Sequence, residues 1–579
     1  MRARLLIVLL AVGLVAGALV VPAVSPGHPE RTTKFPDLSG GGVPRYRNSG
    51  PTLVVCKRDS LARVQAIFAR GDAGLRRQRL AMLRRCRYRN IQAAVNDAKT
   101  GDRILVMPGV YTEEPSRAVP VGSYHEGPCP NDYVETEGFQ NSAPPPVGPA
   151  SNDPPVRPDR NFQVNCPNSK NLIEVVGDPR HEDNPPNPSL PTCLQKCNLQ
   201  ISGYGRGPGD VLIQGDRRKA DVLRIDRADG IYLSNFTVEQ AEFNDIDAVE
   251  VNGFRLSSVV VRYAQNYGAL TFTSGHGLYD HVEAYGNGDS GVYPGSNPKG
   301  CNLDRNAYGT CEQGASAQNP RAGCGPPTTE LRQINSHDNV LGYSGTAGNS
   351  TWVHDSHFHD NNTGLTTDSF AAGHPGMPQE CFQWEHNVIN SNNQNFFTAE
   401  RQDYCNRTPF LLRPKDIVCP QFQTAVGTGV LIGGGNRDLL RDNWIFDNWR
   451  WGAALVAVPA SLRGDNDPNH QQDTSNGNQF MDNRMGVTPD GQRKPNGTDF
   501  FWDEEGVRNC WHANASQSGA SRQSNVATGL PDCPGSDAPA SHPPNPATDS
   551  MLIPCTAWDP QHNPRPVACN WFDTPPQPQ

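Results

Sequence analysis

The chain has 579 residues, of which 36% are hydrophobic, and a formal net charge of −9. Glycine (56 residues) and proline (52 residues) together make up nearly a fifth of it, which suits strands, turns and long loops and excludes a helical bundle. The acidic excess argues against nucleic acid as a partner of the whole chain.

The N-terminus has the features of an export signal. Arg2 and Arg4 precede an uninterrupted apolar run over residues 5–24, and the small residues around Ala23 fit a cleavage site. A run of about 20 residues is also long enough to stay as a membrane anchor. Both alternatives place the remainder outside the cytoplasm, secreted or anchored, and we expect no other membrane contact. The sixteen cysteines lack paired CxxC spacing and predict structural disulfides rather than zinc sites.

Two segments precede the repeats. Residues 25–52 form a Pro/Gly-rich tether without periodicity. Residues 53–89 are strongly basic, with ten arginines that face only Asp59 and Asp72, and their apolar residues have helical spacing. Two interpretations remain open for this basic segment: a solvated face, or a patch that binds an anionic polymer or lipid headgroups.

Residues 90–114 combine a short helix with a buried strand. Ile91, Ala94 and Val95 share one helical stripe, and "RILVMPGVY" reads as a strand. This stretch resembles the opening of right-handed parallel β-helix proteins of the pectin lyase-like superfamily, in which a short helix caps the first coil. The resemblance implies an all-β, right-handed parallel β-helix with three short strands per coil. It also implies a carbohydrate-active protein: a lyase, hydrolase or epimerase that acts on an acidic polysaccharide.

An internal repeat points to the same fold class. From residue 230 the chain repeats at a spacing near 22, with an apolar column and a second one five residues later. Such a period is typical of a solenoid whose rungs bury shared columns. We expect about ten coils over residues 90–490, then a Cys/Pro-rich cap and tail over 491–579, in a monomer. The columns are Leu233, Leu256, Tyr279, Leu331, Val353, Trp384 and Leu440, and Val238, Val261, Ala284, Ser336, Phe358, Ile389 and Ile445.

Asparagine recurs near the turn of most repeats. It tolerates left-handed backbone and bonds the neighbouring chain, so stacked asparagines are expected to stabilise the turns. The predicted ladder consists of Asn244, Asn266, Asn339, Asn361, Asn393 and Asn448.

One tetrapeptide, Gly288-Asp289-Ser290-Gly291, has the four letters that surround the nucleophile of trypsin-like proteases. In the repeat it falls between two strands of one rung, with Asp289 at the asparagine position and Val292 pointing inward. A trypsin-like protease needs a double β-barrel with His and Asp upstream, which these rungs cannot provide. We therefore expect Ser290 to be a turn residue.

The candidate site is an outward column bordered by long insertions. Residues 297–328, 371–380 and 401–425 are expected to leave the solenoid in one phase and to wall a groove. Neighbouring rungs stack about 4.8 Å apart, so consecutive charges of the column are expected to be in contact. We assign catalytic roles to Asp280, Arg332, His354 and Glu385, and substrate binding to Arg441, His386 and His281.

Several alternatives stay open. The same column could be an ion-pair ladder, and the protein a non-catalytic surface module that binds glycan or protein partners. The cluster from His354 to Asp360 could hold a metal, but no third ligand is evident. Gly275-His276-Gly277 matches a tripeptide of polygalacturonases, whose other elements are not recognisable. We expect no metal and no cofactor. Calcium is compatible with the resemblance, but no loop pattern supports it.

Overall fold

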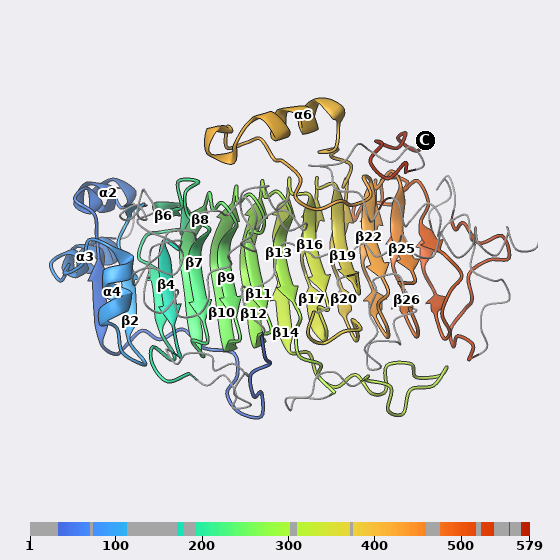
Figure 1. The fold of residues 1–579 in the computed structure, drawn as a ribbon, viewed down its shortest axis with the longest axis horizontal. Coiled ribbons are helices and arrows are strands. Elements are labelled where there is room, and N and C mark those ends of the chain that lie inside the picture. The colour runs from blue at the N-terminus through green and yellow to red at the C-terminus, as the bar shows by residue number, and fades with distance from the viewer. Residues whose placement is uncertain are drawn as a thin grey trace, which may run out of the picture.

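Three ladders of parallel strands wind around one apolar core in the computed structural model of the chain (Figure 1). The predicted fold class, a right-handed parallel β-helix, is confirmed. The structure describes residues 33–69, 73–112, 171–178, 193–301, 310–370, 374–458, 475–516, 523–537, 555 and 569–579. The predicted export segment over residues 1–24 lies outside these ranges. No helix in the described ranges is long and apolar enough to cross a membrane.

Each coil contributes one strand to each ladder. Ladder 1 contains β1 (Thr52–Val55), β2 (Arg103–Val106), β5 (Gln200–Gly203), β8 (Ile231–Glu239), β10 (Asn252–Arg262), β12 (Gly275–Tyr285), β14 (Thr329–Arg332), β17 (Thr351–His354), β20 (Gln383–Glu385), β23 (Leu439–Arg441), β26 (Gln479–Met481) and β29 (Cys510–His512). Ladder 2 contains β3 (Gly109–Tyr111), β6 (Val211–Gln214), the second halves of β8, β10 and β12, β15 (Asn335–His337), β18 (His357–His359), β21 (Val388–Asn390), β24 (Trp444–Phe446), β27 (Arg484–Met485) and β30 (Ala515–Ser516).

Ladder 3 is a separate ten-stranded sheet. It contains β4 (Ile173–Val176), β7 (Asp221–Asp226), β9 (Asn244–Val249), β11 (Ala269–Phe272), β13 (Ser290–Gly295), β16 (Leu341–Thr346), β19 (Thr363–Asp368), β22 (Thr428–Gly433), β25 (Trp451–Val456) and β28 (Phe500–Trp502). Its ten strands agree with the expected number of coils.

The two predicted apolar columns form the core. The strand register pairs Leu233 with Leu256, Tyr279 with Leu331, and so on to Trp384 and Leu440, and each of these side chains is at most 1% exposed. The second column is equally buried, and its one polar member, Ser336, donates its hydroxyl to the carbonyl of Gly342 at 2.7 Å. A hydroxyl satisfied in this way costs little when buried.

An asparagine ladder connects the rungs as predicted at Asn339, Asn361 and Asn448, but not at the other predicted positions. Asn339 Nδ2 lies 3.2 Å from Asn361 Oδ1, and Asn392 lies 3.0 Å from Asn448 in the same manner. The ladder runs through Asn287, Asn339, Asn361, Asn392, Asn448 and Asn496. Asn393 instead accepts a bond from the Trp449 N–H. The predicted positions Asn244, Asn266 and Asp289 lie outside it, and Asn287 takes the place assigned to Asp289.

Between β5 and β6 the corner between ladders 1 and 2 spans seven residues, with a short 3-10 helix at Pro208–Asp210. From β8 onward at most two residues separate the strands of the two ladders, so these corners leave no room for insertions. Each of these later corners contains one left-handed residue, with φ between 50° and 57°. The residues are Asn235, Ser258, His281, Gln333, Asp355, His386, Asp442, Asp482 and Ala513.

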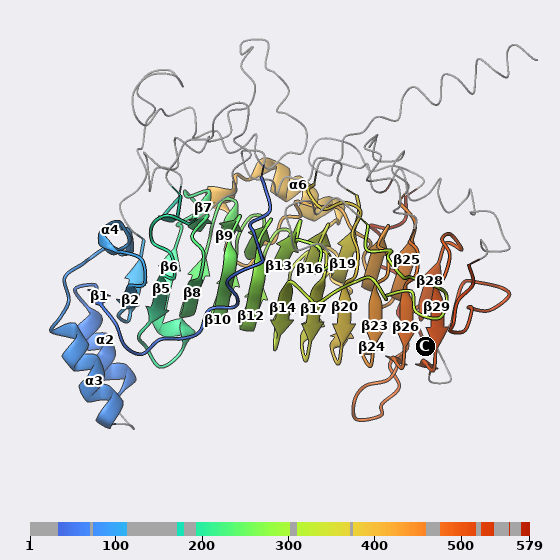
Figure 2. The same cartoon turned by 90° about the horizontal axis from the view of Figure 1, so that it is seen from below.

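The N-terminal end is closed by helices. The predicted capping helix is α4 (Ile91–Asp97), whose Ile91, Ala94 and Val95 enter the core. The basic segment forms α2 (Ser60–Ile67) and α3 (Ala73–Leu83), a pair that projects beyond the first coil (Figure 2). The described part of the expected tether, residues 33–50, is held against the solenoid: the Arg47 guanidinium donates to the carbonyl of Gly101, and Asn252 Nδ2 donates to the carbonyl of Asp37.

Seven disulfides link described cysteines, and these agree with the predicted structural role and support an extracytoplasmic location. At the C-terminal end, residues 496–514 contain β28 and β29 and so add a further coil rather than only covering the last one. The bridges are Cys56–Cys86, Cys193–Cys197, Cys301–Cys311, Cys324–Cys381, Cys405–Cys419, Cys510–Cys533 and Cys555–Cys569.

Candidate functional site

The long insertions leave the solenoid at two corners, so the expectation of a single phase is wrong. Residues 297–328 and 371–380 follow strands of ladder 3, whereas 401–425 lies between β21 of ladder 2 and β22 of ladder 3. In Figure 1 the helix of the latter, α6 (Ala399–Arg407), lies above the solenoid, and the described part of 297–328 lies below it. The insertions therefore flank ladder 3 on both sides.

The predicted outward column exists, with one residue on each rung of ladder 1. The register places Asp280, Arg332, His354, Glu385 and Arg441 side by side in that order. The predicted contacts Asp280–Arg332 and Glu385–Arg441 are present. The other two predicted contacts, on either side of His354, are absent among the ion pairs of the described residues, because His354 and its neighbours bond elsewhere.

Asp280 is held as a carboxylate by two arginines. Arg255 Nη2 lies 2.5 Å from Oδ2, and Arg332 Nε lies 3.1 Å from Oδ1. Burial alone would raise the pKa of Asp280, but hydrogen bonds from Arg332, His281 and Arg255 outweigh it and hold the pKa at about 2. A group this acidic carries no proton at neutral pH. Asp280 can therefore orient Arg332 but cannot serve as a general acid.

His354 is fixed between two carboxylates. Its Nδ1 lies 2.7 Å from Asp355 Oδ2, and its Nε2 lies 3.2 Å from Glu330 Oε1. The ring stacks on Trp352, with centroids 4.1 Å apart. Glu330, which sequence reasoning did not single out, also lies 3.4 Å from Arg332 Nη1 and so links the two. Both ring nitrogens are engaged, which leaves neither aimed at a ligand.

Glu385 is buried and similarly engaged. Its Oε2 accepts a hydrogen bond from Trp352 Nε1 at 2.9 Å, and its Oε1 lies 2.5 Å from Arg441 Nη2. His281 and His386 occupy left-handed corner positions beside the column, and their side chains are 60% and 57% exposed. His281 Nδ1 lies 2.9 Å from Asp280 Oδ1, and His386 Nε2 lies 3.8 Å from Asp442 Oδ2. The column as a whole has the geometry of an ion-pair ladder.

Ser290 is not placed as a nucleophile. It is the first residue of β13, it is fully buried, and its hydroxyl donates to Asp289 Oδ1 at 2.8 Å. Val292 enters the core as expected. Burial raises the pKa of Asp289 to about 7, against hydrogen bonds from Ser290 and Tyr267.

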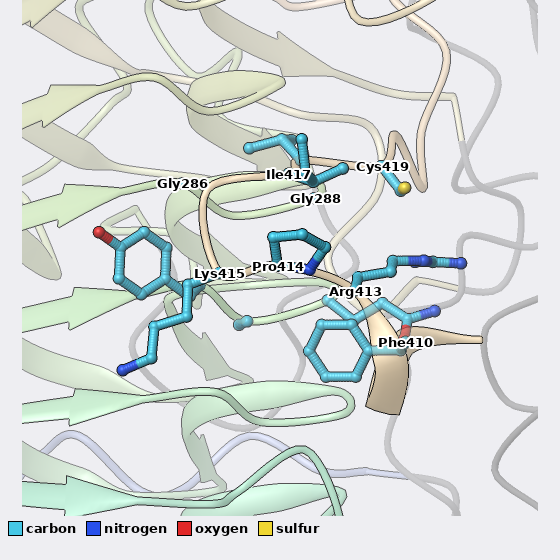
Figure 3. A pocket seen from close by; sticks show the side chains of 12 residues that line it. Gly286, Gly288, Phe410, Arg413, Pro414, Lys415, Ile417 and Cys419 are labelled. Atoms are coloured by element: carbon cyan, nitrogen blue, oxygen red, sulfur yellow. The ribbon is translucent and has the colours of Figure 1, made fainter. Parts of the chain in front are cut away.

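A small pocket lies under the insertion that carries α6 (Figure 3). Phe410, Arg413 and Lys415 line one wall, and Gly288 lies on the opposite one. The Arg413 guanidinium donates to carbonyls of its own loop, and Lys415 Nζ lies 3.1 Å from Glu239 Oε1. These polar groups hold the insertion on ladder 2, so the pocket is a packing gap between the two.

The histidine cluster does not converge on a metal. His357 and His359 share a face, as an extended strand requires, but their rings stack with centroids 4.0 Å apart. His357 Nε2 lies 2.8 Å from Asn390 Oδ1, and His359 Nε2 lies 3.1 Å from Asn335 Oδ1. Each ring thus has its own partner on a neighbouring rung.

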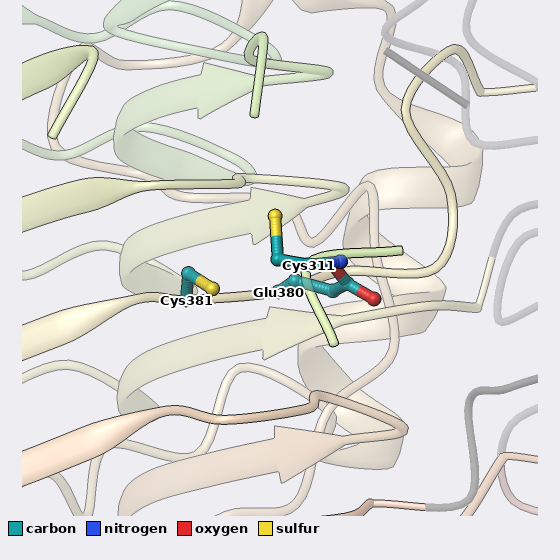
Figure 4. Close-up of side chains that lie close together, drawn as sticks. All are labelled: Cys311, Glu380 and Cys381. Carbon is teal, nitrogen blue, oxygen red and sulfur yellow. The ribbon is translucent and has the colours of Figure 1, made fainter. Parts of the chain in front are cut away.

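Among the described residues, one group has the spacing of a metal site: Cys311, Glu380 and Cys381 (Figure 4). Both cysteines are in disulfides and offer no thiolate. Glu380 accepts a hydrogen bond from the Cys311 N–H at 2.7 Å, and its carboxylate pairs with Arg437. These residues do not fit a metal ion.

The side of ladder 3 that points away from the core carries a buried constellation of side chains that sequence reasoning missed: Tyr293, Asp368 and His374 are each at most 2% exposed. Tyr293 of β13, Thr346 of β16 and Asp368 of β19 lie on three successive rungs. Thr346 Oγ1 donates to Asp368 Oδ2 at 3.1 Å. A Cβ at Gly295 would lie only 2.6 Å from the Tyr293 ring, so the absence of a side chain there lets the ring lie flat along the sheet. His374 belongs to the adjoining insertion, residues 371–380.

Burial raises the pKa of both Tyr293 and Asp368. It raises the pKa of Tyr293 well above the ordinary phenol value, reinforced by the nearby carboxyls of Asp368 and Asp289. Burial also raises the pKa of Asp368 to about 6, against hydrogen bonds from the Phe370 N–H and Thr346. His374 packs edge-on against Phe272, with centroids 5.3 Å apart. The face therefore combines a protonated phenol with a carboxyl that titrates near neutrality, as acid–base sites do.

A buried charge network precedes this constellation on the same face. Arg224 of β7 and Asp247 of β9 are neighbours in the register, with Nη1 2.5 Å from Oδ2. Asp221 and Asp226 lie 3.5 and 4.0 Å from the same guanidinium. Arg224 stands three rungs before Tyr293, or about 14 Å at the usual strand spacing.

No protein-family profile and no curated protein matches the chain. Three solved structures share its winding. The A-module of mannuronan C-5 epimerase AlgE4 of Azotobacter vinelandii aligns with a TM-score of 0.36 and 11% identity over 61% of this chain and 86% of that one. Pectate lyase Pel9A aligns with a TM-score of 0.31 and 10% identity over 83% and 80%. PfbA, a surface adhesin of Streptococcus pneumoniae, gives 0.30 and 10% over 58% and 82%. Similarities this remote concern the fold alone.

Proposed function

We propose that this protein binds an acidic polysaccharide and cleaves or epimerises it on the outward face of ladder 3. The observation that carries the proposal is the position of the long insertions: they rise at both borders of this ladder, whereas at most two residues separate the strands of ladders 1 and 2 from β8 onward. Binding faces of solenoids form where insertions gather. The acid–base constellation of Tyr293, Asp368 and His374 lies on the face that they flank.

Asp368 and Tyr293 have different roles in the proposed reaction. Both elimination and epimerisation of a uronate begin when a base removes the proton on the carbon next to the carboxylate. Asp368, with a pKa of about 6, is largely ionised at pH 7 and serves as that base. Tyr293 remains protonated and returns a proton, either to the departing glycosidic oxygen or to the opposite face of the same carbon.

Replacing Tyr293 by phenylalanine tests these roles. The ring volume is kept and only the hydroxyl is lost, so turnover should fall at least about 100-fold while the midpoint of thermal unfolding stays nearly unchanged. Turnover is measured on a panel of uronic-acid polymers, by ultraviolet absorption of unsaturated products, by new reducing ends, and by deuterium exchange at the epimerised carbon. Wild-type turnover in the variant would remove Tyr293 from the mechanism.

The ladder 1 column remains a second proposal for the reacting groups, with Arg332, His354, Glu385 and Asp280 as catalytic groups and Arg441, His386 and His281 as substrate contacts. The partly exposed Arg332 and Arg441 side chains, 38% and 45% accessible, favour it. Single replacements Arg332→Ala and His354→Ala separate the two locations. On the ladder 3 proposal both variants keep most of their turnover. Arg332→Ala should cost about 0–1 kcal/mol of unfolding free energy, as exposed ion pairs do, and His354→Ala, whose side chain is 12% exposed and stacked on Trp352, about 1–3 kcal/mol. Loss of turnover at unchanged stability would move the chemistry to ladder 1.

The same panel tests the non-catalytic alternative. Binding of a polymer by the wild type, measured by affinity electrophoresis, without any of the three kinds of product would support a surface module that binds glycan and would overturn the enzymatic roles.

A further inference from the structure

The two helices at the N-terminal end concentrate positive charge on a chain that is otherwise acidic. Residues 53–89 contain eleven Lys and Arg and two Asp, a net charge of +9. Because the whole chain carries −9, the remainder carries −18. Surfaces of soluble proteins usually intersperse the two signs, so segregation on this scale points to a ligand of the opposite charge.

The apolar residues of this segment face the solenoid, which leaves the arginines outside. Val64 and Phe68 pack with Val54 and Met107 in a small core, and Cys56–Cys86 ties the ends of the helix pair together. Figure 2 shows α2 and α3 projecting from the end of the solenoid, away from ladder 3. The pair is thus a rigid platform rather than a loose basic tail.

Most of the outward arginines lack an acidic partner. The nearby carboxylates are taken: Asp59 pairs with Arg63 at 2.6 Å and Asp97 with Arg87 at 3.6 Å. Five other exposed arginines have no ion pair with any carboxylate in the described ranges, and we call them the cap patch. These are Arg58, Arg77, Arg84, Arg85 and Arg89.

We propose that the cap patch binds an acidic polysaccharide as a second, non-catalytic site. Guanidinium groups present paired N–H donors that match carboxylates, and a polymer engages several of them at once. The identity of the polymer rests on the proposed function. The cap patch would also assist the proposed function. The rest of the chain carries a charge of −18 and repels a polyanion, so a positively charged patch would help to keep the polymer bound.

The test compares two variants with the same change in net charge. Arg77→Ser with Arg84→Ser removes two members of the cap patch. Arg218→Ser with Arg508→Ser removes two arginines elsewhere, whose side chains are 61% and 31% accessible and which pair with Asp216 and Asp537. All four positions are on the surface, so folding should be retained, and thermal unfolding checks this.

Binding is measured by affinity electrophoresis in polygalacturonate or alginate, with dextran as the neutral control. The cap variant should bind about tenfold more weakly at low salt, and the paired-arginine variant should bind like the wild type. Turnover of a tri- or tetrasaccharide, too short to reach the cap, should be equal in all three proteins. Binding is read without turnover, so the cap can be judged even if the protein has no activity.

Three results would overturn the proposal. Unchanged binding by the cap variant would show that the patch is merely solvated. An equal loss of polymer binding in both variants would show that binding depends on the net charge of the protein and not on the cap patch. Retention on vesicles that contain phosphatidylglycerol, absent on pure phosphatidylcholine and without binding to either polyuronate, would assign the patch to anionic lipid headgroups.

Discussion

Replacing Glu380 by alanine is expected to lower the free energy of unfolding by about 3–5 kcal/mol. Glu380 is fully buried and pairs with Arg437, while Lys299 Nζ lies 3.5 Å from its Oε2. Both cations are themselves buried, and burial already lowers the pKa of Lys299, with Glu380 opposing and Arg437 adding to that effect. Removing the carboxylate takes the buried acceptor from two buried positive charges and from the Cys311 N–H, and leaves Arg437 with the partly exposed Glu312. The loss is measured by urea unfolding followed by circular dichroism.

Glu312 supplies the matched control. It lies 3.2 Å from the same Arg437, but its side chain is 41% exposed, so Glu312→Ala should cost no more than about 1 kcal/mol. The double variant with Lys299→Met should recover part of the loss, because one of the two buried positive charges is gone. A loss near 1 kcal/mol for Glu380→Ala, or no recovery in the double variant, would mean that water reaches the network and that it does not anchor the 297–328 insertion.

The solenoid could be predicted because its inward residues are fixed by periodicity alone. Leu233 and Leu256 are 23 residues apart and occupy one column, so a spacing near 22 predicted both the fold and the core. The outward column from Asp280 to Arg441 followed for the same reason. Errors arose where the register shifts at a turn: Asn392 enters the asparagine ladder in place of Asn393, one residue away, and Asn287 in place of Asp289, two residues away.

The ladder 3 constellation could not be assembled from the sequence. Because side chains alternate along a strand, an inward Val292 in "GVYPGS" predicts that Tyr293 points away from the core. This alternation was the one feature of the sequence that could have indicated Tyr293. Its relation to Asp368 depends on register across a long insertion between β13 and β16, which spacing does not reveal. The 401–425 insertion was assigned to the wrong corner because the short strand β21 that precedes it has only three residues. The sequence also did not predict the partners Glu330 and Trp352. Each lies on a neighbouring rung, where Glu330 contacts His354 and Trp352 contacts Glu385.

Asp438 should make the stability of the solenoid depend on pH. It occupies a position that Asn478 and Asn509 hold in the two following rungs: Oδ1 accepts from the Phe382 N–H at 2.9 Å, and its own N–H donates to Asn478 Oδ1 at 2.9 Å. Burial raises its pKa from 3.8 to about 7, although Gln379, the Phe382 N–H and two arginines lower it. The folded chain therefore binds more protons than the unfolded chain between these two values. The free energy of unfolding must fall as pH rises through this window and level off above it.

Asp438→Asn removes this titration and keeps the shape of the side chain. A pKa shift from 3.8 to about 7 lowers the free energy of unfolding by on the order of 4 kcal/mol at pH 8, relative to low pH. Most of this loss takes place above pH 5. Relative to the wild type, the variant should therefore gain about 2–3 kcal/mol of unfolding free energy between pH 5 and pH 8, measured by urea unfolding at both values. Asn478→Ala is the control, since this neighbouring ladder residue carries no titratable group, and its effect on the unfolding free energy should be the same at both pH values within error. If Asp438→Asn shows no pH-dependent gain, the carboxyl is ionised in the folded chain and Arg437 and Arg321 outweigh its burial.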